Sequence, residues 1–397
     1  MRLVSGSDEM ELNFQQSDSI LDITGSYLRE FVAPVASEID TNPEALQEAI
    51  KGMCDYNLLA LQLPKIWGGA EVSELTYRQF QTLVARYSGA LAFLQTQHQS
   101  AAGFIINSEN EYLKEKYLPY MGNGKILVGV GFSQLRRRGN PLLKAIPISG
   151  GYQLIGTIPW VTGYGFFQDF IIGATLPDSK EIYGIIPFTQ TSSLVVSASA
   201  PSSQTKTLVV SASAPSPQIT QIKFSQPMEL AAMASTNTVT ATLTNYFLPE
   251  SQVIGIRKAG SIHENDKKNI LNHSFLALGC ARAGLDIIKS AAKQKQLNFI
   301  NSAFDCLQAE LNRCESDTIH ALSPELRSWE ERLKLRSWAI NLAQRCANAA
   351  VTVSSGAANY QYHPAQRVSR EALMFTVAGQ TTDVMAATLK LLCIARD

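Results

Sequence analysis

The sequence has no excess of charge of either sign, because 34 Lys and Arg residues balance 34 Asp and Glu residues in 397. A neutral protein has no overall field that attracts nucleic acid or an anionic membrane, although a local anion site is still compatible with it. No uncharged apolar run reaches about 18 residues, the length of a membrane-spanning helix. The N-terminus carries no apparent secretory signal. We therefore expect a cytoplasmic protein with no nucleic-acid and no membrane partner.

Several short motifs are also missing. The chain has no C-x-x-C pair, no G-x-G-x-x-G and no P-loop, which argues against a zinc ribbon, a thioredoxin-like site and a dinucleotide-binding Rossmann unit. We expect no metal site. The cysteines lie mostly in apolar helical stretches and are expected to be buried free thiols of a reducing compartment. They stand at positions 54, 280, 306, 314, 346 and 393.

What the chain does contain is a helical, then β-rich, then helical order of segments. Apolar residues recur at helical spacing from Tyr77 to Leu94, which predicts one packed helix there. Short β-rich runs bounded by Gly, Pro and Asp follow from about residue 128. Helical periodicity returns near residue 261. The predicted domains are 1–125, 126–255 and 256–397, and the order is typical of an α+β fold.

One segment of the β-rich part is duplicated. The run Leu-Val-Val-Ser-Ala-Ser-Ala-Pro-Ser occurs at residues 194–202 and again at 208–216. Two copies are too few for a solenoid. The Ser/Ala/Pro composition offers little apolar area to offset the entropy of ordering. We therefore predict a mobile surface insertion at about residues 190–220.

Near the C-terminus, residues 363–384 contain a Pro, two Arg and a Val-Ala-Gly-Gln-Thr turn. This stretch resembles the final-helix boundary of the flavin-dependent acyl-CoA dehydrogenase family. A Gly-Tyr-Gln-Leu-Ile-Gly run followed by Trp-Val-Thr-Gly resembles the family's central β-strand. Five segments resemble the family in the right order: 31–40, 58–69, 117–124, 151–163 and 247–255.

The resemblance implies a fold with an N-terminal helical domain, a middle β-barrel and a C-terminal four-helix bundle. It also implies a bound FAD, or alternatively FMN, in contact with a set of residues from the β domain and the last turn. Hydroxyl groups in such a place can tune a flavin through hydrogen bonds. The implied residues are Phe132, Ser133, Trp160, Val161, Thr162, Thr381 and Asp383.

Each of these positions also has a purely structural interpretation. Trp160 fits an ordinary strand with a buried aromatic side chain. Thr381 and Asp383 fit a helix N-terminus, where both residue types are favoured. The sequence alone leaves these interpretations open beside the cofactor hypothesis.

The sequence departs from the family where the catalytic base is expected. Alignment of the turn without gaps places Gly379 at the position of the usual Glu, and Asn269 at the alternative base position. Neither side chain is a base, and loss of a general base typically costs about 10²- to 10⁴-fold in rate. The nearest ionisable residues are Glu371, Asp383 and His273, for which we favour structural roles. The catalytic base is thus unassigned.

The family's Glu-Pro-x-x-Gly-Ser-Asp loop is replaced by a stretch with Arg136, Arg137 and Arg138 in succession. A run of like charges is usually a solvated loop. Arg also binds phosphate through two parallel hydrogen bonds, so a phosphate site for FAD, FMN or the CoA pyrophosphate is an equally weighted alternative. The family's Arg-x-x-Phe-Gly motif is likewise changed, to Lys-Gln-Leu-Asn-Phe at residues 295–299.

The resemblance implies an acyl-CoA dehydrogenase-like flavin oxidoreductase that acts on an acyl-CoA, a carrier-bound acyl group or a related small molecule. Without a base, two alternatives stand: a flavin-dependent monooxygenase of the same fold, and a non-catalytic flavin or acyl binder. By the same resemblance we expect a homo-oligomer, either a dimer or a tetramer, since symmetric assembly is common.

Overall fold

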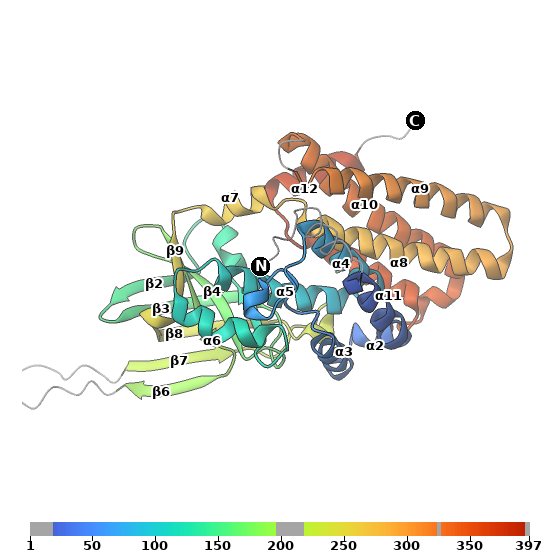
Figure 1. Ribbon diagram of the computed structural model, residues 1–397. Coiled ribbons are helices and arrows are strands. Elements are labelled where there is room, and N and C mark those ends of the chain that lie inside the picture. Colours follow the sequence, from blue (N-terminus) through green and yellow to red (C-terminus); the bar gives the residue numbers. More distant parts are fainter. Residues whose placement is uncertain (1–18, 196–217, 324–326, 394–397) are drawn as a thin grey trace, which may run out of the picture.

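The computed structural model describes residues 19–195, 218–323 and 327–393. Figure 1 shows the strands gathered at one end of the molecule and long helices extending from the other. The predicted order of helical, β-rich and helical parts is confirmed. Most of the duplicated segment, and with it the predicted mobile insertion, falls on residues outside those described.

The N-terminal part is helical up to Met121, and polar caps decide where its main helices begin. Ser73, Ser88 and Asn110 each accept a hydrogen bond from the backbone N–H three residues later, as N-cap residues do. The prediction of one helix through Tyr77 and Leu94 is wrong, because Ser88 adopts an extended backbone and separates two helices. The elements are helical residues 19–27, η1 (Leu28–Val32), η2 (Ala33–Val35), α2 (Ala36–Ile39), α3 (Pro43–Asp55), η3 (Lys65–Trp67), α4 (Glu74–Tyr87), α5 (Gly89–Ile106) and α6 (Glu111–Met121).

The middle part is one sheet in which the strands follow the order β6-β7-β8-β3-β2-β4-β5-β9, with β1 paired in parallel to β4. It corresponds to the expected middle β domain. Among the described strands, this hydrogen-bonded path has β6 and β9 as its ends. The strands are β1 (Val128–Gly131), β2 (Leu143–Ile148), β3 (Gly151–Val161), β4 (Asp169–Thr175), β5 (Glu181–Pro187), β6 (Thr191–Val195), β7 (Gln218–Phe224), β8 (Val239–Pro249) and β9 (Val253–Arg257).

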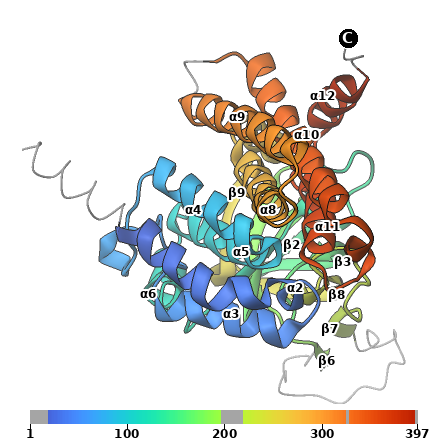
Figure 2. The same ribbon diagram turned by 90° about the vertical axis from the view of Figure 1, so that its right-hand side faces the viewer.

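The C-terminal part is a bundle built around α8. Figure 2 shows α8 at the centre, surrounded by α4, α10 and α11. Two glycines allow this close packing: a Cβ at Gly279 would lie 2.3 Å from the carbonyl oxygen of Thr82, and one at Gly284 would lie 2.8 Å from the backbone of Cys346. The elements are α7 (Ser261–Lys268), α8 (Asn272–Lys295), α9 (Asn298–His320), α10 (Trp329–Ser354), η8 (Ser355–Asn359), α11 (Pro364–Val377) and α12 (Thr382–Leu392).

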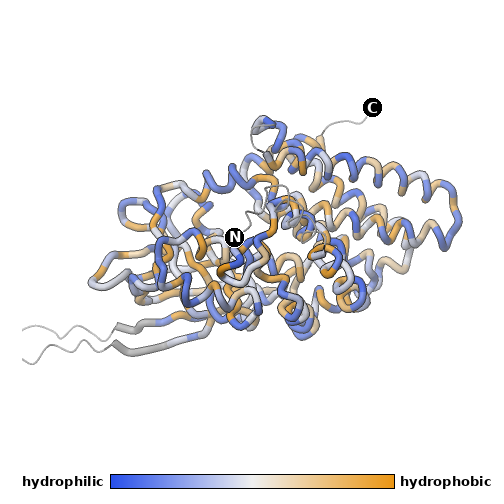
Figure 3. The backbone as a smooth tube through the Cα atoms, in the orientation of Figure 1, coloured by the Kyte–Doolittle hydropathy of each residue, from blue (hydrophilic) through white to orange (hydrophobic). Residues whose placement is uncertain are grey.

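The long helices of this bundle are amphipathic. Hydrophobic and hydrophilic stretches alternate along them in Figure 3, which is typical of helices that pack on one side and face solvent on the other. Within the described residues, no helix combines the length and the apolar character needed to cross a bilayer. The burial of the cysteines differs in the same way from position to position. Cys280, Cys314 and Cys346 are buried, as predicted, whereas Cys306 and Cys393 are exposed, contrary to the prediction.

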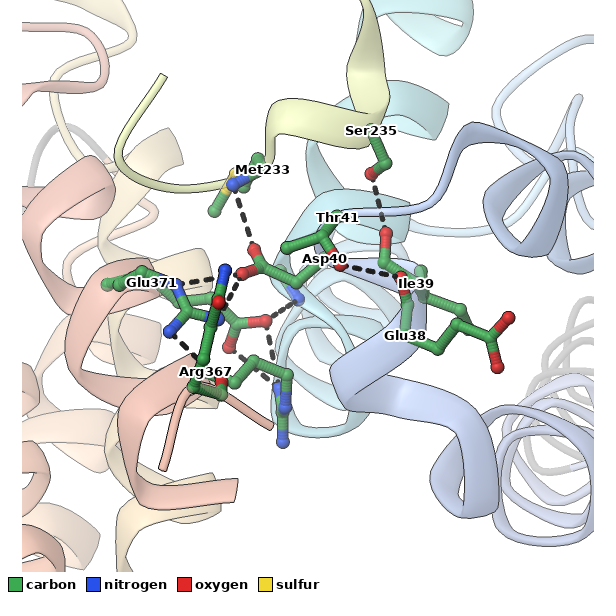
Figure 4. A network of polar contacts seen from close by, with 11 residues as sticks. Glu38, Ile39, Asp40, Thr41, Met233, Ser235, Arg367 and Glu371 are labelled. Carbon is green, nitrogen blue, oxygen red and sulfur yellow. Dashed lines mark hydrogen bonds and ion pairs between the residues drawn. The ribbon is translucent and has the colours of Figure 1, made fainter. Parts of the chain in front are cut away.

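A buried polar network joins the three parts of the chain (Figure 4). Asp40 accepts a hydrogen bond of 2.8 Å from the backbone N–H of Met233 and forms an ion pair of 2.6 Å with Arg370. Ser235 donates to the carbonyl oxygen of Ile39 at 2.5 Å. These contacts connect the N-terminal helices, the loop before β8 and α11. They therefore fix α11, and the turn that follows it, relative to the β domain.

Candidate functional site

The turn between α11 and α12 links two helices whose first turns are capped by side chains. His363 caps the start of α11 through a hydrogen bond from Ala365 N–H to Nδ1, and Pro364 occupies the first helical position. The hydroxyl of Thr381 accepts from Val384 N–H at 3.2 Å and caps α12. The backbone at Gly379 has φ of +64°, a left-handed conformation that costs other residues energy. The turn therefore favours glycine at this position.

The space above Gly379 is filled by an imidazole ring. A Cβ built on Gly379 would lie 2.2 Å from Cδ2 and 2.6 Å from Nε2 of His273, far inside van der Waals contact. Burial lowers the pKa of His273 to about 3, and the nearby Arg336, Arg136 and Arg78 contribute in the same direction. His273 is therefore neutral near pH 7, and it takes the room that a carboxylate side chain at position 379 would need.

The other position considered for a base is equally unsuited. Asn269 ends α7, where its amide donates to the backbone oxygen and to the side chain of Asn265. Glu371 is fully buried and binds Arg367 through both carboxylate oxygens, while it also accepts from Gly89 N–H. Desolvation raises the pKa of Glu371. These contacts give Asn269 and Glu371 structural roles.

The five residues of the β domain that were expected to touch a flavin divide into two groups. Phe132, Val161 and Thr162 are occupied by protein contacts. Phe132 packs against Phe104 and Tyr183 with ring centroids 4.9 Å and 5.7 Å away, and the Thr162 hydroxyl lies 3.0 Å from that of Thr238. Val161 is buried in the core. The side chains of these three residues therefore pack against other parts of the protein.

Ser133 and Trp160 form the second group, because both are exposed. Ser133 begins the short helix η4 (Ser133–Arg136), which packs against β3, the strand that carries Trp160. The indole is 38% exposed, a large fraction for so apolar a group on a core strand. A hydroxyl and an aromatic face on adjoining elements suit the edge and the face of an isoalloxazine. Ser133 and Trp160 are therefore of residue types that can contact a flavin.

The three consecutive arginines have different surroundings. Arg136 makes a two-pronged ion pair with Asp266 of α7, with both N–O distances at 2.7 Å. Arg137 and Arg138 are exposed. The pair between Arg136 and Asp266 ties η4 to the helical part, whereas the other two guanidinium groups are accessible to a ligand.

The expected site residues lie in two separate parts of the structure. Ser133 and Arg136 lie on η4, which contacts α7 and β3, the strand of Trp160. Thr381 and Asp383 lie at the start of α12, which packs on α10. Asp383 is exposed. No group of three or more metal-ligating side chains occurs among the described residues. The sequence interpretation missed Arg336, a fully buried cation whose Nη2 donates to Ala378 at 2.8 Å; no local pattern distinguishes it from surface arginines.

Comparison with known proteins finds relatives of similar sequence. Residues 15–125 match the family model of the acyl-CoA dehydrogenase N-terminal domain. A 3-(aryl)acrylate reductase of Clostridium sporogenes is 22% identical over 76% of this chain and 75% of its own. A probable acyl-CoA dehydrogenase of Bacillus subtilis is 20% identical over 94% of this chain and 97% of its own.

Solved structures agree in fold. The butyryl-CoA dehydrogenase of Megasphaera elsdenii superposes with a TM-score of 0.74 at 15% identity, covering 99% of this chain and all of its own. The glutaryl-CoA dehydrogenase of Mycobacterium smegmatis gives a TM-score of 0.74 at 14% identity, covering 98% and 95%. The chain is therefore related to the acyl-CoA dehydrogenases along most of its length and shares their fold.

Proposed function

We propose that this protein is a flavin-dependent oxidoreductase of the acyl-CoA dehydrogenase type, which acts on an acyl thioester or a related small molecule. The relationship to acyl-CoA dehydrogenases over nearly the whole chain supports this class. The structural observation that carries the proposal is that Ser133 and Trp160 are both exposed and lie on two elements in contact, η4 and β3. FAD is the proposed cofactor, with FMN as the alternative.

In this assignment each side chain has a limited task. A bound flavin supplies a two-electron acceptor for a hydride. Trp160 would shield a bound ring system from water, and Ser133 would hold it through a hydrogen bond. Arg137 and Arg138 bind a phosphate of the cofactor or of CoA. Thr381 and Asp383, at the start of α12, are proposed as further cofactor contacts.

The substrate class follows from the relatives only in part. One relative is named as a reductase of 3-(aryl)acrylates and others as dehydrogenases of acyl-CoA thioesters. Both descriptions concern a carbon–carbon bond next to a carboxyl-derived carbonyl group. We therefore propose oxidation or reduction at such a bond.

A second candidate is favoured by one observation, the packing of His273 over Gly379. A flavin-dependent monooxygenase does not need a base that removes a proton from an acyl α-carbon. A chain with Gly379 and Asn269 at the two base positions, and a neutral imidazole packed over Gly379, is compatible with that chemistry.

Reconstitution separates these candidates. The purified protein is incubated with FAD or FMN, and bound flavin is measured by absorbance. Bleaching of the bound flavin by butyryl-CoA or isovaleryl-CoA without oxygen supports the dehydrogenase. Reduction by an external reductant only, followed by an oxygenated flavin spectrum in air, supports the monooxygenase. Protein that binds flavin but shows neither reaction is the non-catalytic binder, and failure to bind either flavin refutes the proposal.

Two variants test the flavin site directly. Replacement of Trp160 by Ala should weaken flavin binding about tenfold, since an aromatic stacking contact contributes about 1 kcal/mol. Ser133→Ala should have a smaller effect. Tyr112→Ala is the matched control, because this tyrosine is 53% exposed on α6, outside the proposed site. Unchanged affinity in both site variants would remove the cofactor assignment.

A further inference from the structure

The helix α7 lies between the β domain and the C-terminal bundle (Figure 1) and is held at both ends. At its start, Glu181 of β5 accepts from the Ser261 hydroxyl at 2.6 Å and from the Ile262 backbone N–H at 3.1 Å. A carboxylate is favourable at a helix N-terminus. At its end, Arg332 of α10 donates to the carbonyl oxygen of Lys268 at 2.9 Å. Both ends of α7 are therefore fixed by other elements.

Because its ends are fixed, α7 can hold a neighbouring segment through Asp266. The two carboxylate oxygens of Asp266 accept from Nε and Nη2 of Arg136, each at 2.7 Å. The side chain of Asp266 is only 14% exposed. A two-pronged pair between a guanidinium and a carboxylate fixes the relative orientation of the two groups. The pair therefore attaches the last residue of η4 to α7.

The first residue of η4 is Ser133. The segment is a 3₁₀ helix, in which side chains three positions apart lie on the same side. Ser133 and Arg136 therefore share one side of η4. Gln134 lies on another side, where it is buried and donates to the carbonyl oxygen of Gly173 in β4 at 2.7 Å. Gln134 thus attaches η4 to the sheet, and Arg136 attaches the side that carries the exposed Ser133 hydroxyl.

We propose that Asp266 is a positioning residue for the flavin, which acts through Arg136 and orients the Ser133 hydroxyl toward the cofactor. The inference rests on the proposed function, because it requires Ser133 to hydrogen-bond a bound flavin. Hydrogen bonds to the ring system tune the electronic properties of a flavin. Without Asp266, the side chain of Arg136 can turn away, and the hydroxyl of Ser133 loses its fixed orientation.

Limited digestion of the purified protein with trypsin tests the first step. Asp266→Asn should speed cleavage within residues 136–138 severalfold, because loosely held exposed backbone is the preferred site of proteolysis. Glu264→Gln is the matched control, since it changes a carboxylate of the same helix that pairs with the exposed Lys258, and it should leave the rate unchanged. Equal cleavage of Asp266→Asn and wild type would overturn the proposal.

The reduction potential of bound FAD tests the second step. Ser133→Ala and Asp266→Asn should shift it in the same direction, by up to about 30 mV, which is a tenfold change in the equilibrium constant of a two-electron couple. The combined variant should shift it no further than Ser133→Ala alone, because the two residues act as one unit. A shift by Asp266→Asn that persists without the Ser133 hydroxyl is a direct effect of charge and overturns the positioning role.

A second variant separates geometry from charge and covers the case in which Asp266→Asn does not fold. Arg136→Lys keeps the positive charge but cannot form the two-pronged pair, so it should shift the potential as Asp266→Asn does. A potential that Arg136→Lys leaves unchanged overturns this inference alone, whereas wild-type protein that takes up no flavin overturns the proposed function.

Discussion

The imidazole of His273 occupies the place that a side chain at position 379 would enter, with Cδ2 2.2 Å from a Cβ built on Gly379. A side chain at position 379 and the ring of His273 therefore cannot occupy this space together. Restoring the acidic residue alone should fail, because two obstacles remain: the ring itself and the left-handed backbone at residue 379.

We expect Gly379→Glu to destabilise the protein by roughly 2–4 kcal/mol, as the sum of backbone strain and overpacking. Adding His273→Ala should recover about 1–2 kcal/mol of that loss, since the two positions are in contact. Urea unfolding of the wild type, both single variants and the double variant measures this coupling. Additive effects of the two substitutions would contradict the contact.

The same double variant has a catalytic prediction. With room for a carboxylate, Gly379→Glu with His273→Ala should reduce flavin with butyryl-CoA about 10²-fold or more faster than Gly379→Glu alone. The rate of anaerobic bleaching is the measurement. Equal rates in the two proteins would show that room at residue 379 does not limit the reaction.

The buried pair of Arg367 and Glu371 should be important for stability. Both oxygens of Glu371 lie 2.8 Å from Nη1 of Arg367, and Gly89 N–H donates to the same carboxylate. Glu371→Ala leaves a buried cation alone, at an expected cost of about 3–5 kcal/mol. Asp178→Ala, which breaks the exposed pair with Lys180, should cost less than about 0.5 kcal/mol. Similar losses of stability in the two variants would contradict a stabilising role for the pair of Arg367 and Glu371.

His98 gives the protein a specific pH dependence. Its Nδ1 accepts from Val128 N–H and its Nε2 donates to the carbonyl of Met121, both at 3.1 Å. Burial lowers the pKa of His98 to about 4. Between pH 6.5 and pH 4 the unfolded chain therefore binds a proton that the folded chain refuses, and stability falls as the pH decreases.

From pH 7 to pH 5 we expect this histidine to contribute a loss of about 2 kcal/mol, at about 1.4 kcal/mol for each pH unit below 6.5. His98→Gln keeps a donor and an acceptor but does not titrate, so the variant should lose less stability than the wild type over the same range. Denaturant unfolding at the two pH values checks this. An identical pH dependence in both proteins would refute the role of His98.

The three consecutive arginines, Arg136, Arg137 and Arg138, should differ in their roles. Arg136→Ala should lower stability by about 1 kcal/mol, because it breaks a partly buried ion pair with Asp266. Changing Arg137 and Arg138 together to Ala should leave stability within about 0.5 kcal/mol but weaken FAD binding. Riboflavin, which has no phosphate, is the control ligand. Unaltered FAD affinity in the double variant would make this loop a simple solvated surface.

The order of the three parts could be predicted because it depends on periodicity and on segments near in sequence. The β strands from Val128 to Arg257 and the helices beyond Ser261 follow local patterns. The break at Ser88 was missed, since the apolar stripe continues across it. There the competing signal was the capping preference of serine, which ends one helix and begins the next without disturbing the hydrophobic spacing.

Most of the site could not be predicted from sequence, because it depends on contacts between distant residues. The missing carboxylate at Gly379 is visible in the sequence, but the ring of His273 that fills its place comes from another helix. In the sequence Arg136 cannot be told from its two neighbours. In the structure it binds Asp266, which lies 130 positions away. The exposure of Cys306 and Cys393 likewise depends on which helix face turns outward.

Asp40 belongs to the first part of the chain, yet it holds Met233 in the second and Arg370 in the third. A fragment ending near residue 125 would keep this carboxylate and lose both of its partners, and the complementary fragment would retain Arg370 with no acid to meet it. Through Asp40 the stability of each part therefore depends on contacts with the other two. We therefore do not expect the three parts to fold as separate fragments.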